Sequence, residues 1–412
     1  MSASTPPRMR RFAWLRSIWE TDPRRDANRL VYTILATAAL LFPFLAQLTG
    51  NSVMIGVAAD AGVYVLLAIG LNVVVGFAGL LDLGYAAFFA IGAYTYAMLA
   101  SDHGVVTPLD TAIHMPFWIV IFVSLFVAAA FGVILGAPTL RLRGDYLAIV
   151  TLGFGEIVPR VFKNAHEWTS GVNGISALDA PELPVWIQGP WSGDPFAFVQ
   201  NFEIIDSRGY YVIMVILVAV SVILVRNLHA SRLGRAWMAV REDEVAAAAM
   251  GVNTTAIKLL AFAIGAAFSG FAGSFYGAKL SLVSPENFGF VVSITILCMV
   301  VLGGMGNIPG VILGSLLIYY VIFLLLPQMP ETVANFVSAI GLGQLTQRTG
   351  DYPGIAELVS RLKFLVFGLI LVLVMLLRPQ GLLPSREREQ ELQKGTKEDS
   401  TIVDVTAEAE ST

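Results

Sequence analysis

The sequence predicts an all-α, polytopic membrane protein with about ten transmembrane helices and both termini in the cytoplasm. The first observation is its composition: of 412 residues, 56% are hydrophobic and only 14% are charged, whereas a soluble domain has about 25% charged residues. The second is that the apolar residues gather in runs of about 20, the length that a helix needs to cross a bilayer. The third is that lysine and arginine are concentrated in alternate connections between these runs, as the positive-inside rule requires.

The predicted spans lie within residues 30–378, which we expect to form one transmembrane domain. They are residues 30–50, 52–76, 83–101, 114–137, 145–163, 210–226 and 258–280, two spans within 286–331, and 361–378. The uncharged run between Glu286 and Glu331 is twice the length of one span, and the glycine-rich sequence at 303–307 divides it near its middle. Residues 1–29 do not have the pattern of a cleavable signal peptide, so the first span is expected to remain in the protein.

Basic residues predict the orientation of the spans. Residues 1–29, which contain seven arginines, are expected to be a cytoplasmic segment, and so are 227–257 and the charge-dense tail 379–412. Residues 164–209 and 328–360 hold few basic residues and are expected to be outer loops. The tail is also poor in apolar residues, which is typical of disordered chain.

Several classes of function lack the residues that they need. The single cysteine, Cys298, excludes an internal disulfide or a cysteine-based metal cluster, and the four histidines show no pair at the spacing of metal ligands. No Walker A sequence is present, so the chain should not hydrolyse ATP by that route. No nucleophile and base constellation is evident. We therefore expect neither an enzyme nor a chain that itself binds a cofactor, a metal or nucleic acid.

The most polar span, residues 145–163, is a candidate part of a solute pathway. Its helix is expected to be weakened by three residues, Gly153, Gly155 and Pro159. Glu156 lies well inside the span, and a charge at membrane depth costs about 3 kcal/mol on insertion scales, so it normally faces a cavity or a partner. Glu156 could pair with Arg160 one turn later, or a broken helix could offer polar groups to a zwitterionic solute.

Asp60, in the second span, poses the same question. Its carboxylate is expected either to be packed and neutralised inside the protein or to line the pathway. Asp82 lies near the inner boundary of the membrane, where solvation is expected to account for it. The candidate pathway residues are Thr151, Gly153, Gly155, Glu156 and Asp60.

Small residues recur at helical spacing in several of the predicted spans. They are Gly265, Ser269, Gly273 and Gly277, with the adjacent ridge of Ala266, Gly270, Ser274 and Ala278; then Gly306, Gly310 and Gly314; and Gly132 and Gly136. Faces of this kind let helix backbones approach closely in lipid. The pattern is consistent with packing inside the chain or with an interface between subunits.

A polar segment, residues 226–258, separates two long apolar runs on the predicted cytoplasmic side. Acidic residues at 242–244 open an alanine run and Gly251 closes it, so acids stand at the positive end of a helix dipole and glycine at the stop. A helix is therefore expected over 243–250. Its small side chains suit docking against another protein, although a solvated connecting helix is the alternative.

Four motifs together resemble one protein family. They are LRLRGDYLAIVTLGFGEIV (140–158) followed by GVNGI (171–175), SRLGRAWMAVREDEVAAAAMGVNTTAIKLLAFAIGAAFSGFAG (231–273), VLGGMGNIPGVILG (301–314) and RPQGLL (378–383). On these motifs the chain resembles the permease subunits of branched-chain amino-acid ABC importers, of the LivM type, over residues 55–383. The resemblance implies the architecture of an ABC-importer permease.

The resemblance also implies partners and roles. It implies a heterodimer with a second permease of the same type, two ABC ATPase subunits that use the ATP, an extracytoplasmic solute-binding protein, an amino-acid substrate, and a place among the lipids of a bacterial cell membrane. Segment 231–273 resembles the cytoplasmic coupling segment of the family, and Glu244 lies seven residues before Gly251 there. The candidate ATPase-coupling residues are Arg241, Glu242, Asp243, Glu244, Ala247, Ala248 and Gly251.

Two other functions stay open at this point. The first is an ABC permease for urea, amides or other amino acids. The second belongs to another class: a proton-coupled secondary transporter that uses Glu156 or Asp60, against which the docking helix argues.

Overall fold

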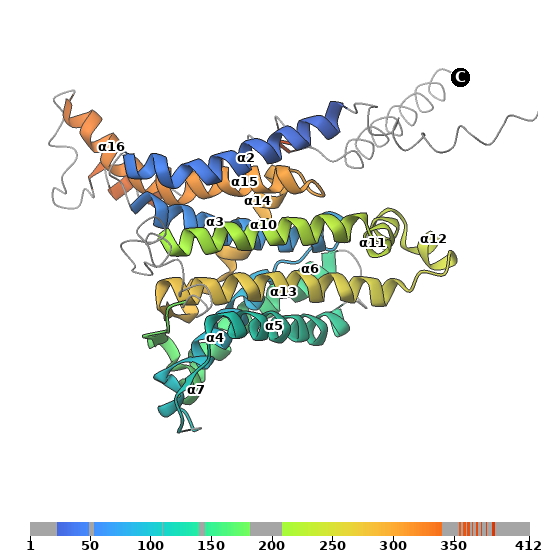
Figure 1. The fold of residues 1–412 in the computed structure, drawn as a ribbon, viewed down its shortest axis with the longest axis horizontal. Helices are drawn as coiled ribbons and strands as arrows, with labels where there is room; N and C mark the ends of the chain where they lie inside the picture. Colours follow the sequence, from blue (N-terminus) through green and yellow to red (C-terminus); the bar gives the residue numbers. More distant parts are fainter. Residues whose placement is uncertain are drawn as a thin grey trace, which may run out of the picture. The chain divides into compact units, whose positions relative to one another are not determined.

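The computed structural model describes residues 23–48, 53–108, 110–139, 145–181 and 208–339, with single positions between 354 and 383. Apart from two pairs of two-residue strands, the elements found in these residues are helices (Figure 1). The prediction of an all-α protein is therefore confirmed. By its contacts the chain forms two compact units, Met1–Asn51 and Ser52–Thr412.

The first unit contributes helix α2, Pro23–Leu48. The helix covers the first predicted span, and its apolar section is Leu30–Ala46. Large apolar side chains along it are exposed, including Leu40, Phe44 and Leu48, as expected of a helix that contacts lipid.

The second unit begins with four helices that correspond to the second to fifth predicted spans. They are α3 (Val53–Leu71, continued by the π-helix η2, Asn72–Phe77), α4 (Tyr85–Leu99), α5 (Phe117–Thr139) and α6 (Asp145–Asn164). Three short elements connect α4 to α5: strand β1 (Ala100–Ser101), the 3-10 helix η3 (Asp102–Val105) and strand β2 (Ile113–His114). Strands β1 and β2 are antiparallel, with Ala100 opposite His114.

Short elements also follow α6, in the region expected to be an outer loop. They are α7 (His166–Thr169), the 3-10 helix η4 (Gly171–Asn173) and strand β3 (Ile175–Ser176). Strand β3 pairs antiparallel with β4 (Leu282–Val283), with Ile175 opposite Val283. This pairing joins the segment that follows α6 to the segment that follows the helix Thr254–Leu280.

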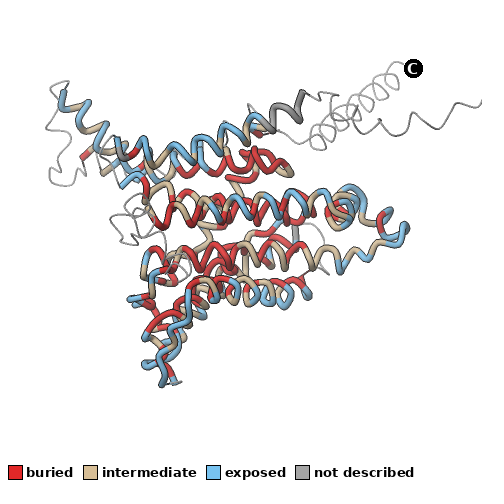
Figure 2. Tube along the Cα trace, viewed as in Figure 1, coloured by how far each residue is buried: buried red, intermediate tan, exposed pale blue. Residues whose placement is uncertain are grey.

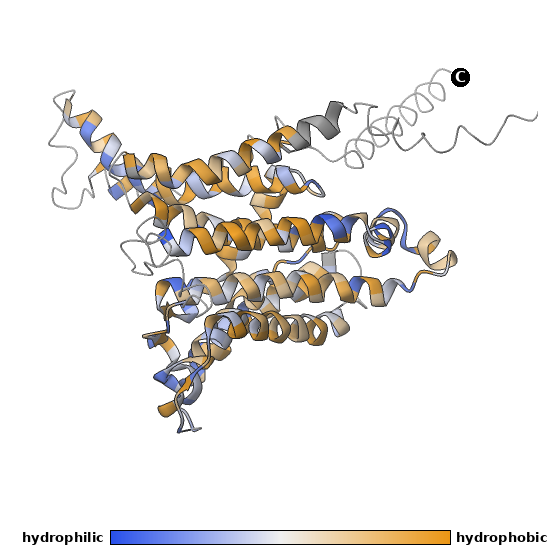
Figure 3. Ribbon diagram, in the orientation of Figure 1, coloured by the Kyte–Doolittle hydropathy of each residue, from blue (hydrophilic) through white to orange (hydrophobic). Residues whose placement is uncertain are grey.

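The remaining helices run from residue 208 to residue 339. They are α10 (Arg208–Ala230), α11 (Arg232–Glu242), α12 (Glu244–Ala249), α13 (Thr254–Leu280), the 3-10 helix η6 (Pro285–Phe288), α14 (Phe290–Gly303), α15 (Ile308–Tyr319), the π-helix η7 (Tyr320–Leu325) and α16 (Leu326–Ala339). Hydrophilic residues gather where α10 passes into α11 (Figure 3).

Helix α13 is the centre of the second unit and packs against α3, α4 and α5. Buried residues recur along it from Ala261 to Lys279 (Figure 2). Glycine makes the close approaches possible, because a Cβ at Gly270 would overlap Ala128 of α5 and one at Gly273 would overlap the backbone of α4. The small-residue face of this helix therefore serves packing inside the chain, which was one of the two interpretations of the pattern.

A tight turn joins α14 to α15 at the glycine-rich sequence that was predicted to divide two spans. Gly304 and Gly306 have φ angles of +111° and +85°, in a region that favours glycine. Beyond the turn, a Cβ at Gly310 or Gly314 would overlap Gly303 of α14, so these glycines also pack inside the chain.

Six helical segments are long and apolar enough to cross a membrane. They are Val53–Phe77, Phe117–Thr139, Arg208–Ala230, Thr254–Leu280, Pro285–Gly303 and Ile308–Ala339, with Leu30–Ala46 and Tyr85–Leu99 as shorter apolar helices. Large apolar side chains of α5 and α10, such as Phe126 and Ile223, are exposed, and both helices are mostly hydrophobic along their length (Figure 3). The chain is a multi-pass membrane protein.

The first part of the segment 328–360, which is expected to be an outer loop, is helical. Helix α16 continues to Ala339. Most of the tenth predicted span, 361–378, lies outside the described residues, and its described positions are helical.

Candidate functional site

The predicted coupling segment, residues 227–257, is folded onto the rest of the second unit through α11. The Ser231 side chain caps this helix by accepting hydrogen bonds from the N–H groups of Leu233 and Gly234. Trp237 is completely buried, and its Nε1 donates a hydrogen bond of 2.7 Å to the carbonyl oxygen of Ile257, just inside α13. The indole therefore fixes α11 against the first turn of the central helix.

Arg241, a candidate coupling residue, connects the same segment to a second helix. Its Nη1 donates a hydrogen bond of 2.5 Å to the carbonyl oxygen of Gly76 in η2. A Cβ at Gly79, where φ is +69°, would contact the aliphatic part of the arginine side chain. Arg241 therefore binds its own chain, and it links the coupling segment to the end of α3.

Helix α12 confirms the helix predicted over 243–250, with bounds one residue shorter at each end. Asp243 is its N-cap, and one carboxylate oxygen accepts hydrogen bonds of 2.8 and 3.0 Å from the N–H groups of Val245 and Ala246. Gly251 ends it with a φ of +85°. The N–H of Val252 bonds to the carbonyl oxygen of Ala247, as in a Schellman motif.

The alanines of α12 are not equivalent. Ala247 is only 5% exposed and packs against its own chain, whereas Ala248 is exposed and Met250 is 85% exposed. Glu244 forms an ion pair of 2.6 Å with Lys258 of α13. Of the other candidate coupling residues, Glu242, Asp243 and Gly251 are exposed. The helix thus presents a small apolar surface while one edge holds it to α13.

The candidate pathway residues do not form one cluster. Helix α6 is continuous through its two glycines and Pro159, so the predicted break is not present. Glu156 pairs with Arg160 at 3.5 Å, and both side chains are substantially exposed. Gly155 lies against Gly84, whereas a Cβ at Gly153 would meet nothing within 4 Å. Packing explains the continuity, since Gly155 is where the helix touches the start of α4.

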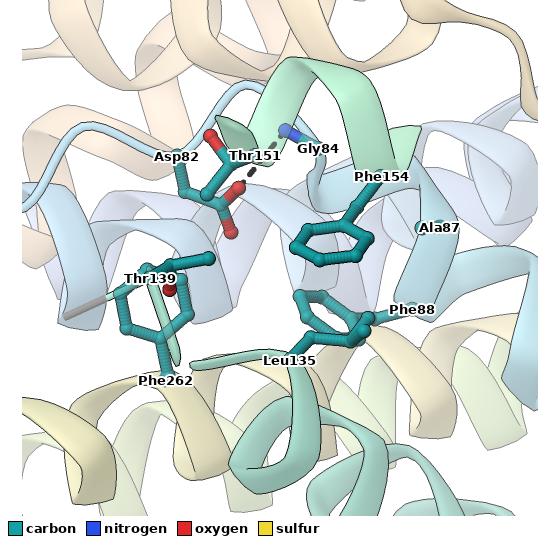
Figure 4. Close-up of a pocket in the computed structure, with 9 residues that line it drawn as sticks. All are labelled: Asp82, Gly84, Ala87, Phe88, Leu135, Thr139, Thr151, Phe154 and Phe262. Atoms are coloured by element: carbon teal, nitrogen blue, oxygen red, sulfur yellow. Dashed lines mark hydrogen bonds between the residues drawn. The ribbon is translucent and has the colours of Figure 1, made fainter. Parts of the chain in front are cut away.

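Thr151 belongs to a different environment, around Asp82 (Figure 4). Its Oγ1 accepts a hydrogen bond of 3.0 Å from the N–H of Leu83. Asp82 is 1% exposed, and its Oδ1 accepts a hydrogen bond of 2.9 Å from the N–H of Gly84. The expectation that Asp82 is solvated is therefore wrong, because the chain before α4 folds inward and is covered by α6.

Burial has two consequences for Asp82. It raises the pKa of the carboxyl to about 6, although the hydrogen bonds from Gly84 and Thr151 act in the opposite direction. Among the described residues, Oδ2 has no hydrogen-bond partner. The side chain borders a small pocket between α4, α5, α6 and α13, which has room for about one water molecule and is too small for an amino acid (Figure 4).

Asp60 has a cationic partner that the sequence did not suggest. Lys279, in the last turn of α13, places its Nζ 2.5 Å from Oδ1 of Asp60 and donates a hydrogen bond of 2.6 Å to the carbonyl oxygen of Gly56. This geometry agrees with a packed, neutralised carboxylate. A sequence signal was present, since a lysine closes the small-residue face of α13, but nothing local points to Asp60.

A second charged cluster lies in the short elements between helices. His114 of β2 contacts Asp179 through Nδ1 at 2.8 Å and Asp102 through Nε2 at 3.0 Å. Hydrogen bonds donated by both ring nitrogens require the protonated ring. The two carboxylates raise the pKa of His114, and Asp179 has the larger effect. The hydroxyl of Tyr96 also donates to the carbonyl oxygen of Asp179, so the cluster ties this strand to the end of α4.

Comparisons with known proteins point in one direction. A family model described as "Branched-chain amino acid transport system / permease component" matches residues 53–375. The chain is 38% identical over 375 residues to the high-affinity branched-chain amino acid transport system permease protein LivM of Salmonella typhimurium (strain LT2), covering 89% of this chain and 78% of the relative. It is 37% identical, with the same coverage, to LivM of Escherichia coli (strain K12).

A second type of permease is more distantly similar. The permease protein LivH of Escherichia coli (strain K12) is 26% identical over 281 residues, covering 67% of this chain and 84% of the relative. The comparison with solved structures found no match.

Proposed function

The chain belongs to the family of permease components of branched-chain amino acid transport systems, and we propose that it forms the translocation pathway for branched-chain amino acids in an ATP-driven importer. The observation that carries the proposal is the identity to LivM proteins across nearly the whole described membrane region. As a permease subunit the chain is a transporter component and not an enzyme.

The proposal includes the partners that the family resemblance implies. The similarity to both LivM and LivH supports a heterodimer with a second, related permease. Two ABC ATPase subunits would hydrolyse the ATP, in keeping with the absence of a Walker A sequence here. An extracytoplasmic solute-binding protein would deliver the amino acid, and the complex would lie in the bacterial cell membrane.

We propose ten spans with both termini in the cytoplasm. Two ends of the second unit support this orientation. One end contains the basic coupling segment, together with η2 and the 304–307 turn. The start of the tail is bonded there as well, because the N–H of Leu382 donates to the carbonyl oxygen of Leu302, at the end of α14. The opposite helix ends carry the short elements: the two strand pairs, η3, α7 and η6. The connections that contain them hold few basic residues.

Helix α12 is the proposed contact for an ATPase subunit. Its exposed surface of small and apolar residues suits a helix-in-groove contact, and the exposed acids Glu242 and Asp243 can meet basic groups on the partner. The Glu244–Lys258 ion pair would transmit a movement of α12 to α13 in the membrane region. The hydrogen bond from Arg241 would transmit it to η2.

A pair of matched substitutions tests this contact. Ala248→Trp adds bulk to the exposed side of α12, and Ala339→Trp adds the same bulk to an exposed alanine at the end of α16, outside the coupling segment. We expect Ala248→Trp to lower both ATPase co-purification and leucine uptake about tenfold, because the added side chain keeps α12 out of the groove of the partner. Ala339→Trp should stay at the wild-type level. Ala247 is unsuitable, since bulk at a buried position would disturb α12 itself.

The outcome that contradicts the coupling role is an Ala248→Trp complex that retains its ATPase and transports leucine at the wild-type rate.

The substrate and the energy source are tested in the same reconstituted wild-type complex. Uptake of labelled leucine should require ATP, resist an uncoupler and be unaffected by excess urea. Uptake that collapses with the uncoupler would instead favour a proton-coupled carrier, and competition by urea would favour a permease for urea or amides.

A further inference from the structure

We propose that Asp60 and Lys279 form a subsite for the two charged groups of a zwitterionic solute. The inference rests on the proposed function and deepens it, because it names the residues of α3 and α13 that the amino and carboxylate groups would contact. Asp60 was a candidate pathway residue on its sequence position alone, and Lys279 was not a candidate.

The pair lies between two helices of the membrane region. Lys279 Nζ is 2.5 Å from Asp60 Oδ1 and 2.6 Å from the carbonyl oxygen of Gly56. The lysine side chain is 8% exposed, whereas the aspartate side chain is 31% exposed. A small polar molecule that approaches the pair therefore meets the carboxylate first and the ammonium group behind it.

Packing between α3 and α13 does not need this pair. The two helices already meet closely at Gly70, where an added Cβ would overlap Phe268 of α13, and at Gly265, where it would overlap Val74 of η2. A buried ion pair is frequently no more stable than apolar residues of the same volume, because both charges lose their hydration. Within the described ranges it is the only ion pair that joins two membrane-spanning helices, and intramembrane charges commonly mark a solute path.

Both charged groups keep capacity for a further partner. The lysine ammonium has three N–H donors, of which the observed contacts with Asp60 and Gly56 use two. The aspartate has a second oxygen, Oδ2, which the ion pair with Lys279 does not use. A donor and an acceptor are thus held side by side. An amino acid offers the complementary pair, an ammonium group for Asp60 and a carboxylate for Lys279.

Tyrosine side chains from α3, α13 and α15 lie near Asp60 and could contact the apolar side chain of a solute. Tyr64, Tyr276 and Tyr319 lie within electrostatic range of Asp60. The Tyr64 ring is 5.5 Å from that of Tyr319 and 5.0 Å from that of Phe323, between centroids. Sites for small molecules combine such apolar walls with a few placed polar groups. The solute would replace the direct Asp60–Lys279 contact with two of its own, so the net charge of the site stays zero.

The test compares three double variants of the full transporter complex. Asp60→Asn with Lys279→Gln removes both charges. Asp60→Lys with Lys279→Asp keeps an ion pair but reverses it. Glu357→Gln with Arg361→Gln is the control, since it removes an exposed ion pair to which no transport role is assigned. Assembly with the ATPase, ATP hydrolysis without solute, and ATP-driven uptake of labelled leucine are measured for each.

We expect the uncharged and the reversed variants to assemble normally and to lose leucine uptake about tenfold or more, as for the loss of a hydrogen bond to a charged group. The control should transport at the wild-type level. Wild-type uptake in either Asp60–Lys279 variant would overturn the subsite and leave the importer function intact. Failure of both to assemble would assign the pair to folding and would also overturn it. Absence of leucine uptake by the wild-type complex would overturn the proposed function itself, and the subsite with it.

Discussion

Replacing Gly92 of α4 by alanine should destabilise the protein, although alanine is the better helix former. A Cβ at this position would overlap the backbone of Gly270 in α13, and neither backbone can move aside as a side chain would. Overpacking of this kind costs about 1–3 kcal/mol, and the rigid partner favours the upper end. Alanine returns about 1 kcal/mol through its helix propensity, so we expect a net loss of ~2 kcal/mol in the free energy of unfolding.

Gly153→Ala in α6 is the matched control. The substitution is the same and the residue again lies inside a helix, but an added Cβ meets nothing within 4 Å. Only the propensity gain remains, so this variant should be more stable by up to about 1 kcal/mol.

The two variants should separate by several degrees in thermal unfolding. A chain of this size shifts its midpoint by about 1–2 °C for each kcal/mol, so the expected difference is about 3–6 °C. Purified protein in one detergent can be heated in steps and the folded fraction measured by size-exclusion chromatography. Equal midpoints for the two variants would refute the close contact between α4 and α13.

Two further predictions concern charge and topology. Because the pKa of Asp82 is raised to about 6 in the folded protein, the native state binds the proton more tightly than the unfolded state. Stability should therefore fall by up to ~3 kcal/mol as pH rises from about 4 to about 7. Asp82→Asn should remove that part of the pH dependence in thermal unfolding; parallel profiles for variant and wild type would contradict the buried carboxylate. In a Cys298→Ala background, Met250→Cys should resist an impermeant thiol reagent in intact cells and Val106→Cys should react, since both side chains are exposed; the reverse labelling would invert the topology.

Local chemistry made much of the fold predictable. Uncharged runs of about 20 residues identified the helices, and the structure has a helix over each of the first nine predicted spans. Asp243 and Gly251 likewise marked α12, since a capping carboxylate and a glycine with positive φ act within one turn of the residues that they stabilise.

The parts that could not be predicted depend on contacts between distant segments. Lys279 meets Asp60 only because α13 packs along α3, and no property of either neighbourhood in the sequence reveals it. Asp82 was expected to be solvated from its position beside a span, but α6 covers it. In α6 itself, packing outweighs the weak helix propensity of Gly155, because its missing Cβ is what admits Gly84.

The π-helix η7 has a consequence for how this chain can change in length. A π-turn inserts one residue into a helix, which turns every side chain beyond it by about 100°. The helix from Ile308 to Ala339 therefore consists of two parts in different rotational phase, with the buried residues concentrated in α15 and the exposed ones in α16. Deleting one residue of η7 would restore a uniform helix without opening a loop. It would leave the α14–α15 contact untouched and would rotate only the surface that α16 presents, so this turn is a place where a single-residue deletion can redirect one outer helix and preserve the core.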